Sequence, residues 1–273
     1  MTAPPVDLVV NCFERSYRKV LAPGFFGAIE ADNVRPFAMR TAVINNVDDR
    51  ADADGRAQAL VDAGEIDRYV FVADHLDDAL ARCGLTRADI EPIPYFTDFA
   101  IVAACLDGPD WMVHWDADVR LRPQVDWIGP AIELMERDRR VMVACPNWEV
   151  DNLAEQTLEE AGSFAIGQGF SDQAFLARRS ELAAPIYRQR CLALRRYPLS
   201  HLGPIFEARV DAHMRHAGRL RAVFRDARYV HDVEMGTSWP ARTLRERALQ
   251  ARDDLIIRTL RALPWRPRHL RQI

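Results

Sequence analysis

Short apolar runs alternate with stretches of helical periodicity along the first half of this chain, and that alternation restricts the fold more than any other feature. Each run is rich in β-branched and aromatic residues and is bounded by polar, glycine or proline residues, which predicts buried strands. The predicted strands are Val6–Cys12, Thr41–Asn45, Tyr69–Ala73, Trp111–Trp115 and Val141–Cys145. Strands that alternate with helices predict an α/β fold whose central sheet is mostly parallel.

Helical periodicity fills the segments between these strands. The predicted helices are Arg56–Ala63, His75–Cys83, Asp98–Leu106 and Trp127–Arg137. Thr97 or Asp98 is the expected N-cap of the third helix, because short oxygen-bearing side chains satisfy free N–H groups there. In parallel sheets ligands bind beyond the carboxyl ends of the strands, so polar residues that follow the strands are the first candidates for a site.

The second half of the chain is less regular. A helix is predicted over Phe206–Ala217, followed by two short strands, Arg221–Phe224 and Ala227–Val230. From Ala241 onward the composition shifts to nine arginines against three acidic residues. We therefore expect one α/β domain over residues 1–240 and an Arg-rich helical extension over residues 241–273.

Composition and charge narrow the setting. The 36 basic and 40 acidic residues give a formal net charge of −4, which gives no reason to expect a nucleic-acid partner. The five cysteines are scattered without metal-ligand spacing, so we expect reduced and mostly buried thiols. The N-terminus lacks the pattern of a signal peptide, and no apolar run is long enough to span a bilayer. These features predict a cytoplasmic protein.

An acidic triplet directly follows one of the predicted strands. The apolar run Trp111–Trp115 leads into Asp116-Ala117-Asp118. Two carboxylates two residues apart at a strand end can approach one cation, and Mg²⁺ and Mn²⁺ accept carboxylate and phosphate oxygens in the same coordination shell. A divalent cation placed there would neutralise the charge that builds on a departing nucleoside diphosphate.

The segment PDWMVHWDADVRL resembles the strand that carries the DxD motif in GT-A glycosyltransferases, the class that includes glycosyltransferase family 2. Other segments follow in the order of that family, over roughly residues 6–235. They are the polar loop NCFER, the strand ending NNVDD, the Gly-rich GQGFSDQAFLARRSEL, the helix PIFEARVDAHMRHAG and the late strand RDARYVHD. The second strand departs from the family because it lacks a DDGS-like ending, and Phe206-Glu207 replaces the usual acidic pair.

The resemblance implies a Rossmann-like GT-A fold and a metal-dependent glycosyltransferase that uses a nucleoside-diphosphate sugar, with a UDP-sugar favoured. It implies that Asp116, Asp118 and His231 serve Mn²⁺ or Mg²⁺ and the diphosphate. The spacing of Glu207 to Gly218 matches the family's catalytic carboxylate, which implies a base and an inverting transfer. Asp172 is the competing candidate for the base.

Residues after the first two strands are candidates for the rest of the donor. Phe13 is placed to pack on the nucleobase and Arg15 to meet phosphate, while Asn45 and Asp48 are placed to hydrogen-bond the base or ribose. Ordinary loop roles are the alternative for each of them. Trp148 and Trp239 are candidate sugar-stacking faces or simply core residues.

The acceptor is expected to be a glycan or a lipid-linked glycan in the synthesis of a bacterial surface polysaccharide. The extension has an apolar face formed by Leu249, Ile256, Leu260 and Leu263, which admits two interpretations. One is peripheral contact with the inner face of an anionic membrane. The other is packing on the domain or on a second subunit in a homodimer.

Three other functions compete with the transferase. A DxD phosphatase needs a downstream lysine, whereas Lys19, the sole lysine, lies upstream of the triplet. A sugar nucleotidyltransferase would carry a Gly-rich basic loop after the first strand, and CFERSYRKV has no glycine. An inactive nucleotide-sugar-binding module would have little reason to keep all of Asp116, Asp118, Glu207 and His231.

Overall fold

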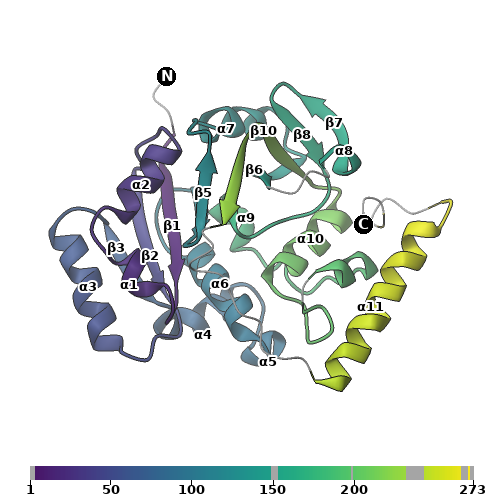
Figure 1. Ribbon diagram of the computed structural model, residues 1–273, viewed down its shortest axis with the longest axis horizontal. Helices are drawn as coiled ribbons and strands as arrows, with labels where there is room; N and C mark the ends of the chain where they lie inside the picture. The colour runs from purple at the N-terminus through teal and green to yellow at the C-terminus, as the bar shows by residue number, and fades with distance from the viewer. Residues whose placement is uncertain (1–3, 149–152, 198, 232–242, 266–269, 271–273) are drawn as a thin grey trace.

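A large mixed sheet forms the centre of the protein in the computed structural model, which describes residues 4–148, 153–197, 199–231, 243–265 and 270. Within these residues the sheet has ten strands, and nine of them run in the order β3-β2-β1-β4-β9-β6-β10-β8-β7, with β5 paired to β10 (Figure 1). Their bounds are β1 Val6–Cys12, β2 Met39–Ile44, β3 Arg68–Phe71, β4 Trp111–Asp116, β5 Val119–Arg122, β6 Val141–Trp148, β7 Thr157–Ala161, β8 Phe164–Gly167, β9 Ala174–Arg178 and β10 Leu220–His231.

The strands β3, β2, β1 and β4 are mutually parallel, as the alternation of strands and helices predicted. Strand β9 runs antiparallel to both β4 and β6, and β10 resumes the parallel direction beside β6. The register pairs Asn11 of β1 with Asp116 of β4. The carboxyl ends of these two strands therefore meet at one edge of the sheet.

Helices cover both faces of the sheet because successive strand residues point to opposite sides. In β1, Leu8 and Val10 pack toward α1 (Tyr17–Val20), α2 (Phe25–Asp32), α3 (Arg50–Asp62) and α7 (Ile128–Arg137). Val9 packs toward α4 (Val72–Arg82), α6 (Asp98–Cys105), α9 (Arg179–Leu182) and α10 (Phe206–Ala217). The remaining short elements are α5 Arg87–Ile90, η1 Pro94–Phe96, α8 Leu153–Gln156 and η2 Leu192–Arg196.

The prediction of two short strands near the end of the domain was wrong. Residues 221–224 and 227–230 belong to one twelve-residue strand, β10. Its pairing with β6 shifts register between Phe224 and Arg228, where Arg225 and Asp226 are exposed. The strand continues through this irregularity because β8 pairs with its first part and β5 with its last part. The predicted strand Tyr69–Ala73 also ends early, at Phe71, because Val72 begins α4.

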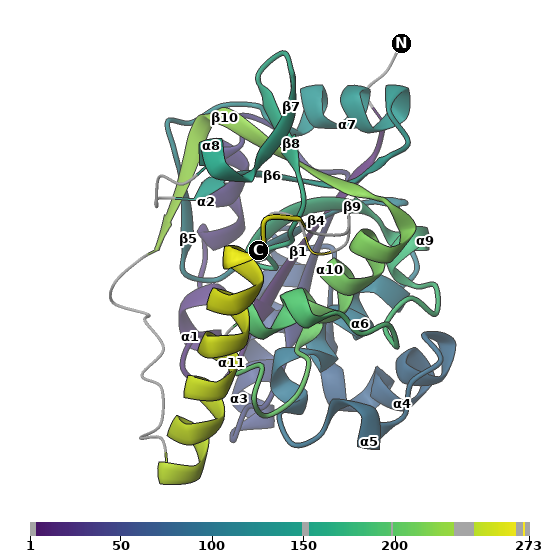
Figure 2. The same ribbon diagram turned by 90° about the vertical axis from the view of Figure 1, so that its right-hand side faces the viewer.

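The C-terminal helix α11 (Leu244–Ala262) lies against η2, and Figure 2 shows it in front of the domain. Ile257 and Leu260 are buried, whereas Leu263 is 42% exposed, so the predicted apolar face was wrong at that residue. The buried side also includes Asp253, whose carboxylate accepts hydrogen bonds from Arg195 at 2.5 Å and Ser200 at 3.0 Å. This face packs on the domain, as one of the two interpretations expected.

No helix among the described residues combines the length and the apolar composition needed to cross a membrane. The predicted domain boundary at residue 240 lies outside the described residues. The five cysteines are free, and three of them (Cys12, Cys83 and Cys145) are buried.

Candidate active site

A cleft of about 440 Å³ opens at the edge of the sheet where β1, β2 and β4 end. Its walls come from segments that are far apart in the sequence, because parallel strands bring their carboxyl ends to the same edge. The lining residues are Asn11, Phe13, Ser16, Asn45, Asn46, Tyr95, Phe96, Phe99, Asp116, Ala117, Asp118, Asp172, Gln173, Leu199, Ile205 and Glu207. Four of the predicted site carboxylates therefore lie in one cleft.

Asp116 ends strand β4 and is held by His114, which precedes it on the same side of the strand. The Nε2 atom of His114 lies 3.2 Å from Oδ1 of Asp116. The imidazole packs between Phe99 and Phe175, with centroid distances of 5.4 and 5.3 Å. Its buried Nδ1 has no hydrogen-bond partner among the described residues, so the proton belongs on Nε2, which donates to the carboxylate. The spacing of two residues along a strand was a signal for His114 that sequence reasoning missed.

Asp118 pairs with the residue at the end of strand β10. Its Oδ2 lies 3.3 Å from Nδ1 of His231, because β5 and β10 are antiparallel and place His231 opposite Val119. Burial raises the pKa of Asp116, hydrogen bonding from His114 lowers it, and the charge of Asp118 raises it further. The three predicted metal-binding residues are therefore close enough to interact electrostatically.

The described residues contain no group of three His, Cys, Asp or Glu side chains arranged to hold a metal ion by themselves. The chemistry of the side chains nevertheless suits a hard divalent cation, because Asp116 and Asp118 supply carboxylate oxygens and His231 supplies nitrogen. Oxygens of a bound ligand would have to complete such a shell. Mg²⁺ in particular is often held by one or two carboxylates together with phosphates.

A second pair of acidic side chains, Glu207 and Asp172, also lines the cleft. Glu207 is in the first turn of α10, and the backbone N–H of Asp172 donates to its Oε1 at 3.3 Å. Burial raises the pKa of Glu207 to about 7, although the Asp172 N–H and the charge of Arg196 oppose that rise. Burial also raises the pKa of Asp172 well above its usual range, and Glu207 and Asp116 add to the effect.

The segment that carries Asp172 is held by η2 and by Tyr197, the residue that follows it. The Tyr197 hydroxyl donates to the Phe170 carbonyl at 3.1 Å and accepts from the Phe170 N–H at 3.2 Å. Gly169 has a φ of +109°, and a Cβ there would lie 2.8 Å from Nη2 of Arg196. Only glycine allows this backbone conformation together with so close an approach of the guanidinium.

Arg196 also belongs to a buried ion cluster one turn below Glu207. Its Nη2 donates to Oδ2 of Asp211 at 3.2 Å, and Nε of Arg215 lies 2.9 Å from both oxygens of that carboxylate. Glu207, Asp211 and Arg215 recur every four residues, so they share one face of α10. Arg196 and Arg215 offset the negative charge of Asp211, and Arg196 also that of Glu207. None of the sequence patterns indicated this cluster.

The described lining of the cleft is acidic. It includes Asp116, Asp118, Asp172 and Glu207, and none of the described lining residues is a lysine or an arginine. Arg196, the nearest charge partner of Glu207, lies below the lining. A ligand that bears phosphate groups would be repelled from these walls unless a cation entered with it.

The remaining donor candidates divide into two groups. Phe13 and Asn45 line the cleft, whereas Arg15 and Asp48 are exposed and lie outside its lining. The Asn45 side chain donates to Asp98 at 2.8 Å. Burial raises the pKa of Asp98 to about 6, although the Phe99 N–H and Asn45 oppose the rise.

Three further outcomes concern the start of α6 and the two tryptophans. Thr97 occupies the N-cap of α6 but makes no capping hydrogen bond through its side chain. Trp148 is 49% exposed and outside the lining, and Trp239 lies outside the described residues. Neither Thr97 nor Trp148 lines the cleft.

Comparison with known proteins now bears on this arrangement. No family model and no curated protein sequence matches the chain. The solved structure of GalNAc-T7 with UDP, GalNAc and Mn²⁺ aligns with a TM-score of 0.50 at 9% identity, over 84% of this chain and 44% of that one. The chain has the GT-A fold. It spans less than half of the length of GalNAc-T7.

A structure of glucosyl-3-phosphoglycerate synthase from Mycobacterium tuberculosis, in complex with Mn²⁺, UDP and phosphoglyceric acid, aligns at 12% identity with a TM-score of 0.40. That alignment covers 96% of this chain and 80% of the synthase. The fold rests on the similarity to GalNAc-T7, which at 9% identity leaves the chemistry to the residues of the cleft. Those residues lie at the carboxyl edge of the sheet, as the α/β rule predicts.

Proposed function

We propose that this protein is a metal-dependent glycosyltransferase that moves a sugar from a nucleoside-diphosphate donor to an acceptor hydroxyl. One observation carries the proposal: four acidic side chains line a single cleft of a GT-A fold, and the described part of that lining contributes no lysine or arginine. An anionic donor can approach such walls only together with a cation. A divalent metal and a diphosphate therefore complement this cleft as a pair.

Asp116, Asp118 and His231 are the residues proposed to hold Mn²⁺ or Mg²⁺. When bound, the metal would supply positive charge to stabilise the departing diphosphate. His114 orients the Asp116 carboxylate through the contact at 3.2 Å. The imidazole is itself held in place by the two phenylalanine rings that pack on it. The proposed metal-binding residues on β4 and β10 are thereby attached to the rigid sheet rather than to a loop tip.

Glu207 is the proposed base. Its carboxylate takes the proton of the acceptor hydroxyl as that oxygen forms a bond to the anomeric carbon. The bond from the anomeric carbon to the diphosphate oxygen breaks, and the nucleoside diphosphate leaves with the electron pair. Attack from the side opposite the leaving group gives an inverted product.

The environments of the two carboxylates support this assignment over the alternative, Asp172. A pKa near 7 leaves Glu207 half ionised at neutral pH, which suits a general base. Burial and the charges of Glu207 and Asp116 raise the pKa of Asp172 well above its usual range, which favours a hydrogen-bonding role for this side chain over that of a base. Two coupled carboxyl groups with separated pKa values commonly divide acid and base roles in this way.

Phe13 and Asn45 are proposed to contact the nucleoside, because they line the cleft beside the ends of β1 and β2. Arg15 and Asp48 stay candidates only for contacts made at its margin. The preference for a UDP-sugar, the surface-glycan acceptor and peripheral contact of α11 with a membrane are finer parts of the same proposal. The phosphatase alternative needs a lysine in the site. Lys19, the sole lysine of the sequence, is an exposed residue of α1 and does not line the cleft.

A donor screen tests the proposal. UDP-, GDP- and dTDP-sugars are incubated with the full chain, Mn²⁺ and a simple glycoside acceptor, and release of the nucleoside diphosphate is measured. We expect turnover of one nucleotide class, its loss on chelation of the metal, and an inverted anomeric centre in the product by NMR. Retention would contradict the role of Glu207, and failure of every donor together with nucleotide binding would favour the inactive binding module.

A further inference from the structure

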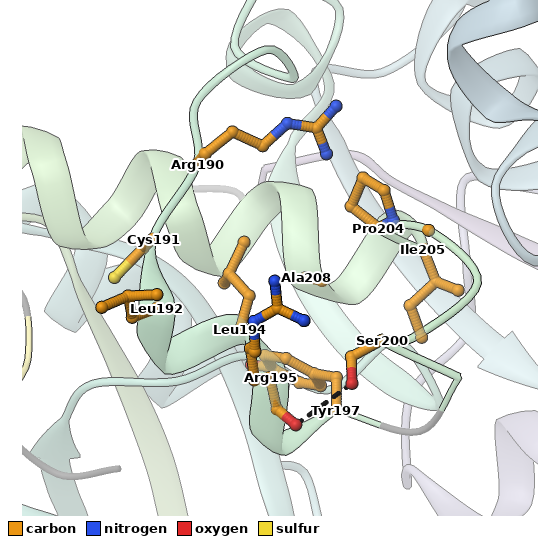
Figure 3. Close-up of a pocket in the computed structure, with 11 residues that line it drawn as sticks. Arg190, Cys191, Leu192, Leu194, Arg195, Tyr197, Ser200, Pro204, Ile205 and Ala208 are labelled. Carbon is orange, nitrogen blue, oxygen red and sulfur yellow. Dashed lines mark hydrogen bonds between the residues drawn. The ribbon is translucent and has the colours of Figure 1, made fainter. Parts of the chain in front are cut away.

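A second cavity, of about 380 Å³, lies between η2, the segment after it and the start of α10 (Figure 3). Its surface is mostly apolar, with contributions from Leu192, Leu194, Pro204, Ile205 and Ala208. This volume falls within the range of about 300 to 1,000 Å³ that is typical of small-molecule sites. The proposed donor site and its metal do not use this cavity.

Basic side chains border this cavity, whereas acidic side chains line the cleft. Arg190 and Arg195 are among its lining residues, and the described part of the lining includes no carboxylate. Arg195 also meets Asp253 of α11 at 2.5 Å, whereas Arg190 is exposed and the described residues place no acidic partner beside its guanidinium. In Figure 3 the Arg190 side chain lies above the other lining side chains, whereas the Arg195 guanidinium lies among them. An apolar surface with basic side chains beside it complements an apolar group attached to an anion.

The two cavities share a wall at the start of α10. Ile205, the N-cap of that helix, lines both of them. Glu207 faces the cleft, and the next residue, Ala208, faces the second cavity. Successive residues of a helix point about 100° apart, and one turn rises only about 5.4 Å. The two cavities are therefore neighbours across Ile205, with the proposed base on one side of the start of α10 and Ala208 on the other.

We propose that the second cavity binds the acceptor, and that the acceptor carries an apolar chain or ring next to a phosphate or carboxylate. This inference rests on the proposed function, because it names the substrate that brings the hydroxyl to Glu207. The apolar part lies against Leu192, Leu194 and Ile205, and the anionic group pairs with Arg190. The hydroxyl that receives the sugar extends past Ile205 into the cleft.

Binding of simple amphiphiles tests the proposal without turnover. Decyl phosphate, decanoate, decanol and inorganic phosphate are titrated calorimetrically into the full chain, each amphiphile below its micelle concentration. We expect one molecule of decyl phosphate or decanoate to bind per chain, about tenfold more tightly than decanol, because a charge-assisted hydrogen bond to Arg190 adds to the apolar contact. The phosphate and carboxylate probes distinguish the two anions.

Substitutions at exposed lining residues localise the binding. Leu192→Glu introduces a carboxylate into the cavity and should weaken the anionic probe at least about tenfold, and Arg190→Gln should weaken it about three- to tenfold. Leu158→Glu is the matched control, because Leu158 of β7 is 50% exposed and Leu192 is 49% exposed. Arg139→Gln is the control for the arginine, since Arg139 is exposed and does not line the cavity. Thermal unfolding of each variant reports whether it folds.

Three results would overturn the proposal: no binding of either anionic probe, equal affinity for decanol, or equal losses in the target and control variants. Wild-type titration with UDP, GDP or dTDP and Mn²⁺ separates this inference from the proposed function. If one of these nucleotides binds and the amphiphiles do not, only the acceptor site is wrong. If none of UDP, GDP and dTDP binds with Mn²⁺, the proposed function is wrong whatever the amphiphiles do.

Discussion

The two cavities that meet at Ile205 differ in charge more than in size. Among the described residues, the lining of the cleft has four acidic side chains and no lysine or arginine, whereas that of the second cavity has two arginines and no acidic side chain. Their volumes are similar, at about 440 and 380 Å³. The start of α10 therefore separates two neighbouring cavities, one suited to a cation and the other suited to an anion.

The difference follows from where each cavity lies in the fold. The cleft is built on the ends of parallel strands, so its residues are fixed by the sheet. The second cavity is formed by η2, the segment 199–205 and α10, and α11 holds this region through Asp253, Arg195 and Ser200. Leu199, which lines the cleft from this segment, has a φ of 59° and thus a strained backbone for a non-glycine residue.

Among substitutions in the acidic cleft, replacing the proposed base should reduce the transfer rate most. Glu207→Gln keeps the size of the side chain but removes the proton acceptor, so transfer should fall by about 10²- to 10⁴-fold while UDP and Mn²⁺ still bind. Steady-state rates and nucleotide titration measure the two effects. Glu133→Gln, at an exposed residue of α7, is the matched control. A larger loss from Asp172→Asn than from Glu207→Gln would exchange the roles of the two carboxylates.

The pH dependence of transfer should sharpen the link between Glu207 and the arginine beneath it. Because the base must be ionised and burial raises its pKa to about 7, the rate should fall as pH drops below about 7. Arg196 lowers that pKa, so Arg196→Gln should move the acidic limb upward by about one pH unit. Arg196→Lys retains the charge and should restore the wild-type profile.

In the Arg196 variants Asp211 keeps its hydrogen bonds to Arg215, so the negative charge of Asp211 is still offset. A profile in Arg196→Gln that superimposes on the wild type would show that Glu207 does not sense this charge. The rate profile distinguishes this role from simple stabilisation, because a structural loss would lower the rate at every pH.

The smallest effect concerns stability at Gly169. Gly169→Ala should destabilise the fold by about 1 to 3 kcal/mol, because φ is +109° and the new Cβ would lie 2.8 Å from Arg196. Gly55→Ala is its counterpart, since Gly55 lies inside α3 with no atom near the added Cβ. That change should stabilise the helix by about 0.5 to 1 kcal/mol. Urea unfolding of both variants checks the contrast, and equal shifts would contradict the close approach.

The parallel half of the fold was predictable because each strand carries its own signal. The predicted strand Val6–Cys12 coincides with β1, and Trp111–Trp115 differs from β4 by one residue. Asp116 and Asp118 were visible as candidates because they follow a strand whose apolar content is unmistakable. The antiparallel part was harder, since exposed Arg225 and Asp226 interrupt the apolar pattern of β10 although pairing continues on both sides.

The surroundings of the proposed base could be predicted from the sequence only in part. Glu207 and Asp172 were identified through family resemblance, while Arg196, Tyr197 and Asp211 carry no local pattern that reveals a role. Their contacts join residues that the fold brings together, such as Tyr197 with Phe170. The predicted roles of Arg15 and Asp48 lose support for a related reason, because loop geometry decides which side chains turn into the cleft.

Nucleotide-dependent stabilisation tests the central claim, that the acidic cleft holds a divalent metal against a nucleoside diphosphate. Thermal unfolding is measured for the wild type, Asp118→Ala and the control Asp226→Ala, an exposed residue of β10, with UDP or GDP in the presence and absence of Mn²⁺. At about 100 times Kd, ligand binding adds about 2.7 kcal/mol, or about 5 to 10 °C in Tm. We predict this shift only with Mn²⁺, in the wild type and Asp226→Ala but not in Asp118→Ala; no shift with either nucleotide, or an equal shift in Asp118→Ala, would contradict the account.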